Sequence, residues 1–145
     1  MDRLLEVTVL FQHDMESNLG ARGLTVSRTH LLWVLHHAGP CKQHELAEAL
    51  DVTPRNVTGL VDALVATGFV VREPHPTDRR ATLVILSDKG AATMEAMAAE
   101  REQVADGLVA GMSAATVDRM TGDLEVVLLN LRTMISEAGR TPESP

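Results

Sequence analysis

Aromatic residues are scarce in this sequence, which has no Tyr, two Phe and one Trp among its 145 residues. Proteins that bind single-stranded nucleic acid or RNA loops stack the bases on aromatic side chains. The chain offers almost no such stacking surface. If it has a nucleic acid partner, that partner is expected to be duplex DNA.

Cysteine and long apolar runs are scarce as well. The one cysteine, Cys41, excludes an intramolecular disulfide and a zinc finger built on paired cysteines, and we expect it to be a buried, inert thiol. No apolar run approaches the ~20 residues that span a bilayer. The acidic, interrupted N-terminus does not resemble a signal peptide. We therefore expect a cytoplasmic protein without a membrane partner.

The motifs of common enzymes are missing. The sequence contains no Gly-rich phosphate loop, no nucleophile elbow and no His-Glu-x-x-His pattern, so we expect neither an enzyme nor a bound cofactor. Its histidines do not follow a recognised metal-ligand spacing, so no metal site is predicted. They are His13, His30, His36, His37, His44 and His75.

Basic residues are outnumbered, and the net charge is −7. The acidic excess is uneven, because residues 42–82 carry a net charge of only −1 by our count of the sequence. An acidic body with a near-neutral segment is compatible with DNA binding. It predicts modest nonspecific affinity, because few phosphates can be neutralised.

Hydrophobic periodicity predicts a mainly α (α+β) fold with a two-stranded hairpin. The capping residues Thr25, Thr53, Ser87 and Ser113 mark helix starts, and Pro54 stands at a first helical position. The predicted helices cover residues 3–19, 26–38, 43–50, 54–67, 87–111 and 113–137, and the predicted strands cover 69–72 and 82–86.

Two of these helices, 43–50 and 54–67, are separated by a short turn and form a helix-turn-helix pattern. An apolar stripe would pin the second helix to the core. Its polar residues cluster in the first turn and a half, the part of a recognition helix that contacts base edges. The candidate DNA contacts are Thr53, Arg55, Asn56 and Thr58. An ordinary amphipathic surface helix stays the alternative.

The predicted hairpin has a charged tip, Asp78, Arg79 and Arg80, on an otherwise apolar ribbon. A hairpin beside a helix-turn-helix is a wing, and arginine at its tip can enter the narrow, electronegative minor groove. Asp78 would repel phosphate, so we expect it to orient an arginine. A solvated charged turn is the alternative.

The first and last predicted helices carry apolar stripes that the rest of the chain has little surface left to cover. Burial against a second copy is the simplest solution, and two-fold dimers are the commonest oligomers. Pairing of the two helices within one chain is the alternative. The residues predicted to dimerise are Leu4, Val7, Phe11, Val117, Leu124, Leu128 and Leu131.

Nearly the whole chain resembles the MarR (multiple antibiotic resistance regulator) family. The resemblance is carried by residues 45–50, 53–64, 69–72 and 78–90. The last stretch matches the family's wing signature, Asp-x-Arg, a strand, and a Leu-Thr/Ser-x-x-Gly ending. Gly59 and Ala63 stand where the family commonly has basic residues. Lys42 replaces the usual Ser/Thr cap, so the helix that follows should start loosely or be capped by another group.

The resemblance implies a triangular dimer with interlocked first, fifth and sixth helices, and a palindromic operator in double-stranded DNA. It implies one MarR-like domain over 1–138, with a winged helix-turn-helix at 25–86 and dimerisation helices at 1–20 and 87–138. Residues 139–145 are expected to be a disordered tail.

We therefore expect a sequence-specific repressor that a small-molecule ligand releases from DNA. The resemblance places a ligand pocket, suited to a small aromatic anion, beside Phe11, His13, Arg28, His30 and Trp33. Core packing of Trp33 and Phe11 is the alternative to that pocket. The alternative functions are a winged-helix protein-interaction or dimerisation module without DNA binding, and a redox- or metal-responsive regulator.

Overall fold

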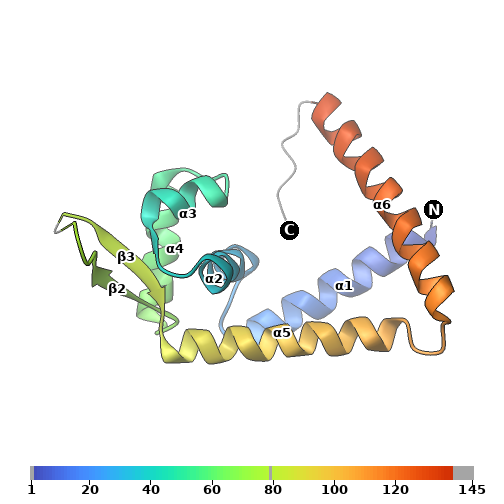
Figure 1. The fold of residues 1–145 in the computed structure, drawn as a ribbon, viewed down its shortest axis with the longest axis horizontal. Helices are drawn as coiled ribbons and strands as arrows, with labels where there is room; N and C mark the ends of the chain where they lie inside the picture. The colour runs from blue at the N-terminus through green and yellow to red at the C-terminus, as the bar shows by residue number, and fades with distance from the viewer. Residues whose placement is uncertain (1, 79, 139–145) are drawn as a thin grey trace. The chain divides into compact units, whose positions relative to one another are not determined.

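The computed structural model describes residues 2–78 and 80–138. Figure 1 shows their elements, which are α1 (Asp2–Ala21), α2 (Val26–Ala38), β1 (Cys41–Lys42), α3 (Gln43–Ala49), α4 (Pro54–Ala66), β2 (Val70–Pro74), β3 (Thr82–Leu86), α5 (Asp88–Leu108) and α6 (Ala114–Glu137). They fall into two compact units, one ending at Glu95 and one starting at Ala96. The tail predicted at 139–145 lies outside the described residues.

Three of the four predicted caps start α2, α4 and α6. The hydroxyl of Thr25 accepts a hydrogen bond from Arg28 N (3.4 Å), that of Thr53 from Asn56 N (3.3 Å), and that of Ser113 from Thr116 N (3.3 Å). Each bond satisfies one of the backbone N–H groups that a helix start leaves without an intrahelical partner.

The start of α3 is capped in a different way. Lys42 precedes it and has no side-chain oxygen that could accept a backbone N–H. The carboxylate of Glu45 instead folds back and accepts a hydrogen bond from Lys42 N at 2.6 Å. This is one half of a capping box, and it confirms the expectation that another group caps this helix.

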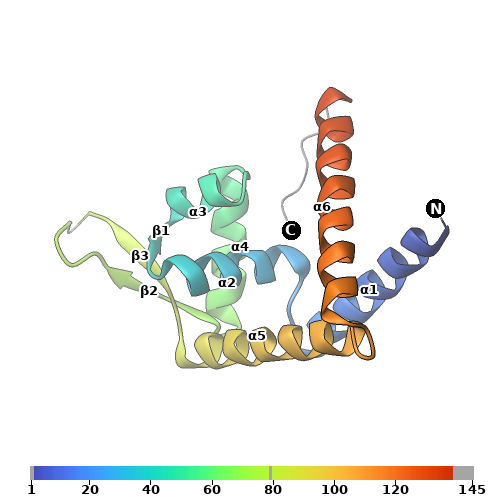
Figure 2. The ribbon, with the colours of Figure 1, turned by 45° about the vertical axis from the view of Figure 1, so that its right-hand side comes forward.

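The sheet contains the predicted hairpin and one strand that was not predicted. Strand β3 pairs antiparallel with β2 on one side and with the two-residue β1 on the other. Figures 1 and 2 show the β2–β3 hairpin projecting from the cluster of α2, α3 and α4. In β1, Cys41 pairs with Val84 of β3. This strand was not predicted because two residues are too few to show an alternating pattern.

The core of the first unit lies where α2, α3 and α4 meet the sheet and the start of α5. From α4, Val57, Val61 and Leu64 are fully buried, whereas Val65 at the edge of the predicted stripe is 37% exposed. The other fully buried side chains are Leu31, Leu32, Leu46, Val70, Val84 and Met94. Burial of one side of α4 fixes which of its residues face solvent.

Serine 87 joins the end of α4 to the start of α5. Its hydroxyl donates to the Gly68 carbonyl at 2.6 Å and accepts from Gly90 N at 3.0 Å, and its own N–H donates to Phe69 O at 3.0 Å. Gly68 has φ = 77°, a left-handed conformation suited to glycine just after a helix end. The predicted Ser87 cap of α5 is thereby confirmed.

Lysine 89 reinforces this junction. Its ammonium donates to Thr67 O at 2.7 Å, beyond the last turn of α4, and lies 4.1 Å from the centroid of the Phe69 ring. A cation at a helix C-terminus satisfies a free carbonyl and complements the helix dipole. We call Thr67, Gly68, Phe69, Ser87, Lys89 and Gly90 the α4–α5 clamp.

Helix α6 belongs to the second unit, and none of its described residues is buried. The exposed large apolar residues of α6 are Leu124, Val126, Val127, Leu128, Leu129, Leu131 and Met134. In the first unit, α1 also leaves large apolar residues exposed, including Leu4, Val7 and Phe11.

Among the described residues, none of the helices combines the length and the apolar character that a membrane span requires.

The clamp yields a test of stability. A Cβ atom added at Gly90 would lie 2.0 Å from the carbonyl oxygen of Phe69, a distance that only a backbone shift can relieve. Gly90→Ala should therefore destabilise the fold by at least the ~1–3 kcal/mol typical of overpacking. Urea unfolding at one fixed protein concentration measures the effect.

The matched control is Gly107→Ala in the same helix, because a Cβ there meets nothing within 4 Å. Alanine is the better helix former by up to about 1 kcal/mol, so this variant should be neutral or more stable. Equal unfolding midpoints for Gly90→Ala and the wild type would contradict the close approach.

Candidate nucleic-acid interface

The first turns of α4 present the predicted contact residues to solvent. Thr53, Arg55, Asn56 and Thr58 are all exposed, while Val57 between them is buried. The structure thus brings these four side chains together at one end of a helix whose opposite side is fixed in the core. Arg55 and Asn56 have side chains that can form paired hydrogen bonds to guanine and adenine edges.

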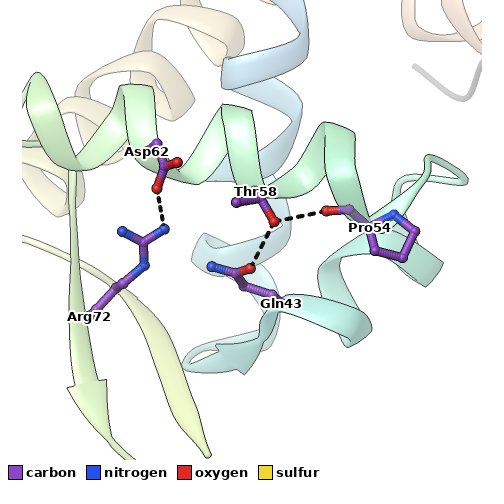
Figure 3. A network of polar contacts seen from close by, with 5 residues as sticks. All are labelled: Gln43, Pro54, Thr58, Asp62 and Arg72. Carbon is purple, nitrogen blue, oxygen red and sulfur yellow. Dashed lines mark hydrogen bonds and ion pairs between the residues drawn. The ribbon is translucent and has the colours of Figure 1, made fainter.

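The two threonines also hold local structure. Thr53 Oγ1 accepts from Asn56 N, which leaves its own proton free to donate. Thr58 Oγ1 donates to Pro54 O at 3.0 Å and lies 3.3 Å from Gln43 Oε1 of α3 (Figure 3). A hydroxyl carries one proton, so the Pro54 carbonyl and the Gln43 amide oxygen share it, while the Gln43 amide nitrogen points away from Thr58 (Figure 3). The role of Thr58 in DNA contact stays a prediction.

An ion pair that sequence analysis missed connects α4 to the wing. Arg72 Nη2 of β2 lies 2.5 Å from Asp62 Oδ1 of α4 (Figure 3). The side chains are 33% and 60% exposed, so the pair contributes at most about 1 kcal/mol. The ion pair matters for position, because it holds strand β2 of the wing against the exposed side of α4.

Backbone hydrogen bonds shape the wing tip. Asp78 Oδ1 accepts from Arg80 N at 3.1 Å, and Ala81 N donates to the Asp78 carbonyl at 3.0 Å. Arg80 is exposed, and the predicted contact Arg79 lies outside the described residues. Asp78 was expected to orient an arginine, and its described side-chain bond holds the backbone of the turn. That it also orients an arginine side chain stays a prediction.

His75, which sequence analysis did not assign to the wing tip, takes part in the same turn. Its Nδ1 accepts from Thr77 N at 3.3 Å and from Asp78 N at 3.2 Å. A ring nitrogen accepts only when it carries no proton, so this turn requires the tautomer with the proton on Nε2. In the sequence, the prolines on either side of His75 predict only an interruption of the strands.

The residues proposed to line a ligand pocket come from two helices. Phe11 and His13 of α1 are exposed, and Arg28, His30 and Trp33 of α2 are half-buried. The Trp33 ring instead lies beside His36 and His37, with centroids 5.5 Å away in each case. Neither cavity described in the structure includes any of the five residues, so this pocket stays a prediction.

Cys41 is buried at the start of β1, where its thiol donates to the Gly39 carbonyl at 3.3 Å. Burial raises the pKa of this thiol above its ordinary value of 9.0, and the Glu45 carboxylate raises it further. Reactive thiols require the opposite environment. Among the described residues, no three His, Cys, Asp or Glu side chains gather closely enough to hold a metal ion.

Comparison with known proteins finds similarity to one family. Residues 24–82, which span α2 to the start of β3, match the MarR family model. Over this segment the chain is similar to the MarR family. The matched residues include α3, the Thr53-capped α4 and strand β2.

Curated relatives of the chain are named as transcriptional regulators. The regulator YdgJ of Bacillus subtilis is 34% identical over 63% of this chain and 56% of its own length. The repressor IacR of Pseudomonas putida is 28% identical over 86% of this chain and 74% of its own. The chain spans little more than half of the B. subtilis relatives YdgJ and YetL.

Solved structures share the fold. A mutant MarR from E. coli is 26% identical, covers 88% of this chain and 96% of its own, and has a TM-score of 0.66. A mutant of S. aureus MepR, solved bound to an oligodeoxyribonucleotide, is 21% identical with a TM-score of 0.69, covering 88% and 94%.

The burial of Cys41 predicts slow thiol chemistry. Iodoacetamide at pH 8 should alkylate the native protein far more slowly than the urea-unfolded chain. The raised pKa also fixes a pH dependence. The unfolded thiol ionises first as the pH rises above about 9.0, so stability falls from there until the folded thiol ionises as well.

The Cys41→Ala variant supplies the control, because it should lack this part of the alkaline loss of stability. Equal alkylation rates for the folded and unfolded chains would contradict the buried thiol. That result would favour a redox-responsive protein.

Proposed function

We propose that the protein is a sequence-specific duplex-DNA-binding transcriptional regulator that acts as a repressor. One observation carries the proposal. Helix α4 buries Val57, Val61 and Leu64 and turns Arg55 and Asn56 to solvent beside a projecting wing. A helix of this kind fits the major groove, whose base edges its first turns can contact.

The contacts divide by chemistry. Arg55 would bind guanine O6 and N7, and Asn56 would bind adenine N6 and N7. The Thr53 hydroxyl, which retains a free proton, suits a phosphate oxygen. From the wing, Arg80 would enter the minor groove with Arg79 as its predicted companion, on a turn held by Asp78.

The names of related proteins support this proposal. IacR and YetL are both named transcriptional repressors, and MepR was solved bound to an oligodeoxyribonucleotide. A repressor of this kind would act in the cytoplasm. We retain release by a small aromatic anion as a prediction, and its candidate contacts are Phe11, His13, Arg28, His30 and Trp33.

A protein-interaction module is the rival from a different class. Such a module would offer apolar side chains where α4 meets solvent, and the exposed first turns here carry Thr, Arg and Asn. A redox-responsive regulator is disfavoured by the burial of Cys41 and by the raised pKa of its thiol.

We further propose that the regulator is a homodimer. In the single chain, Leu124, Leu128 and Leu131 of α6 are between 42% and 49% exposed, and Leu4, Val7 and Phe11 of α1 between 44% and 50%. Val117 of α6 is half-buried. An exposed apolar face on a helix, as α1 and α6 each carry, is typical of an interface between subunits. A two-fold dimer would bind the two halves of a palindromic operator.

Substitution of Arg55 or Asn56 by Ala tests the proposed readout. Each change should relax the preference at one base position per half-site, because loss of a bidentate contact costs about 1–3 kcal/mol of discrimination. Half-site centres should lie about 10–10.5 base pairs apart. Binding selection from randomised duplexes, followed by titration of the operator, measures both quantities.

Random duplex DNA is the comparison for these variants. Weaker binding to operator and random DNA by the same factor would reassign the two residues to phosphate contact. Absence of duplex binding by the wild-type protein under low salt would overturn the proposed function itself.

A charge on α6 tests assembly. Leu128→Glu would bury an unpaired carboxylate in the proposed interface, at a cost of about 3–5 kcal/mol, and should dissociate the dimer and weaken operator binding. Light scattering and DNA titration measure these effects.

Leu129→Glu is the matched control, since that residue is 65% exposed and lies on the side of α6 opposite the centre of the stripe. It should leave the dimer intact. A wild-type protein that scatters as a monomer at micromolar concentration would contradict the homodimer.

A further inference from the structure

Beside α4 lies an open cavity that the proposed base contacts do not use. Its volume is about 370 Å³, and its lining comes from the end of β1, the start of α3, strand β2 and the residues where β3 begins. The lining residues are Lys42, Gln43, His44, Arg72, Ala81 and Thr82. We call this cavity the wing notch.

Two contacts attach the wing notch to the exposed side of α4. Gln43 on one rim contacts Thr58, and Arg72 on the other rim pairs with Asp62 (Figure 3). Thr58 and Asp62 are four residues apart, so they lie on the same face of the helix. The notch therefore borders the surface that α4 would present to a duplex.

The notch carries cationic groups with unused donors. No described residue forms a hydrogen bond or ion pair with the Lys42 ammonium, and Glu45 contacts the Lys42 backbone N–H. Arg72 uses Nη2 for Asp62, and a guanidinium has five N–H donors. The Gln43 amide and the Thr82 hydroxyl add neutral donors. This set suits an anion with one charge and several acceptor oxygens.

The duplex backbone supplies anions of this kind at the required place. B-DNA carries one phosphate charge per ~1.7 Å along its axis, so phosphates flank any helix in the major groove. Helix α4 contributes Arg55 as its one base, since Gly59, Asp62 and Ala63 follow on its polar faces. Cations for the flanking phosphates must therefore come from neighbouring elements.

We propose that the wing notch binds a phosphodiester of the duplex backbone, with Lys42 and Arg72 supplying charge and Gln43 and Thr82 supplying hydrogen bonds. This inference rests on the proposed function and adds a sequence-independent contact to it. Asp62 holds Arg72 at the rim, and its carboxylate limits how much positive charge the notch presents. The notch thus fixes position on the duplex and does not select bases.

The salt dependence of binding tests this site. Lys42→Gln and Arg72→Gln should each lower the slope of log K against log salt by about 0.9, the value for one phosphate contact. Over the decade from 1 M to 0.1 M salt, that slope corresponds to about an eightfold loss of affinity at 0.1 M. The loss should be equal on operator and on unrelated duplex.

Three further variants make the test specific. Lys42→Arg and Arg72→Lys retain the charge and should retain the slope, which a merely structural defect would not explain. Arg101→Gln removes the same charge from an exposed position in α5 and should leave the slope unchanged. Circular dichroism melts confirm that each variant is folded before its affinity is compared.

Ethylation interference locates the phosphate. On wild-type protein, at least one ethylated phosphate beside each half-site should block binding, and on Lys42→Gln that position should no longer matter. A wild-type protein that fails to bind any duplex overturns the proposed function. A wild-type protein that binds, with Lys42→Gln and Arg72→Gln matching Arg101→Gln in slope and footprint, overturns the wing notch alone.

Discussion

At Gly90 the first turn of α5 lies so close to the Phe69 carbonyl that a Cβ atom would be 2.0 Å from its oxygen. This approach places Ser87 and Lys89 within reach of the last carbonyls after α4, where they donate to Gly68 and Thr67. The orientation of α4, the exit of β2 and the start of α5 therefore depend on one another. A side chain at position 90 would have to move all three, because the atom it meets belongs to the backbone.

Most of the fold could be predicted because its signals are local. The caps at Thr53 and Ser113, the proline at 54 and the apolar periods each act within one turn of chain, and the helices follow them. Strand β1 could not be predicted, since two residues have no period and pair only because β3 lies beside them. The need for glycine at position 90 could not be predicted either, because the Phe69 carbonyl approaches it only in the folded chain.

The candidate site divides in the same way. Exposure of Arg55 and Asn56 followed from the helical period, because the residues opposite them are apolar. The pairing of Asp62 with Arg72 and the contact of Gln43 with Thr58 connect separate elements and could not be deduced from spacing. His75 accepts hydrogen bonds in the wing turn because of the path that the backbone takes there. The alternation of apolar and polar residues that predicts strands does not predict that path.

The contacts of Thr58 and Asp62 have a consequence for exchanging recognition helices between regulators. If α4 were replaced by the corresponding helix of a relative, the graft would meet Gln43 of α3 and Arg72 of β2 already in position. A helix without a hydroxyl at 58 and a carboxylate at 62 would leave both partners unmatched. Operator preference in this protein therefore depends on paired positions in α3, α4 and β2. A transplant of α4 by itself would transfer the residues that contact bases, but not the contacts that orient the helix.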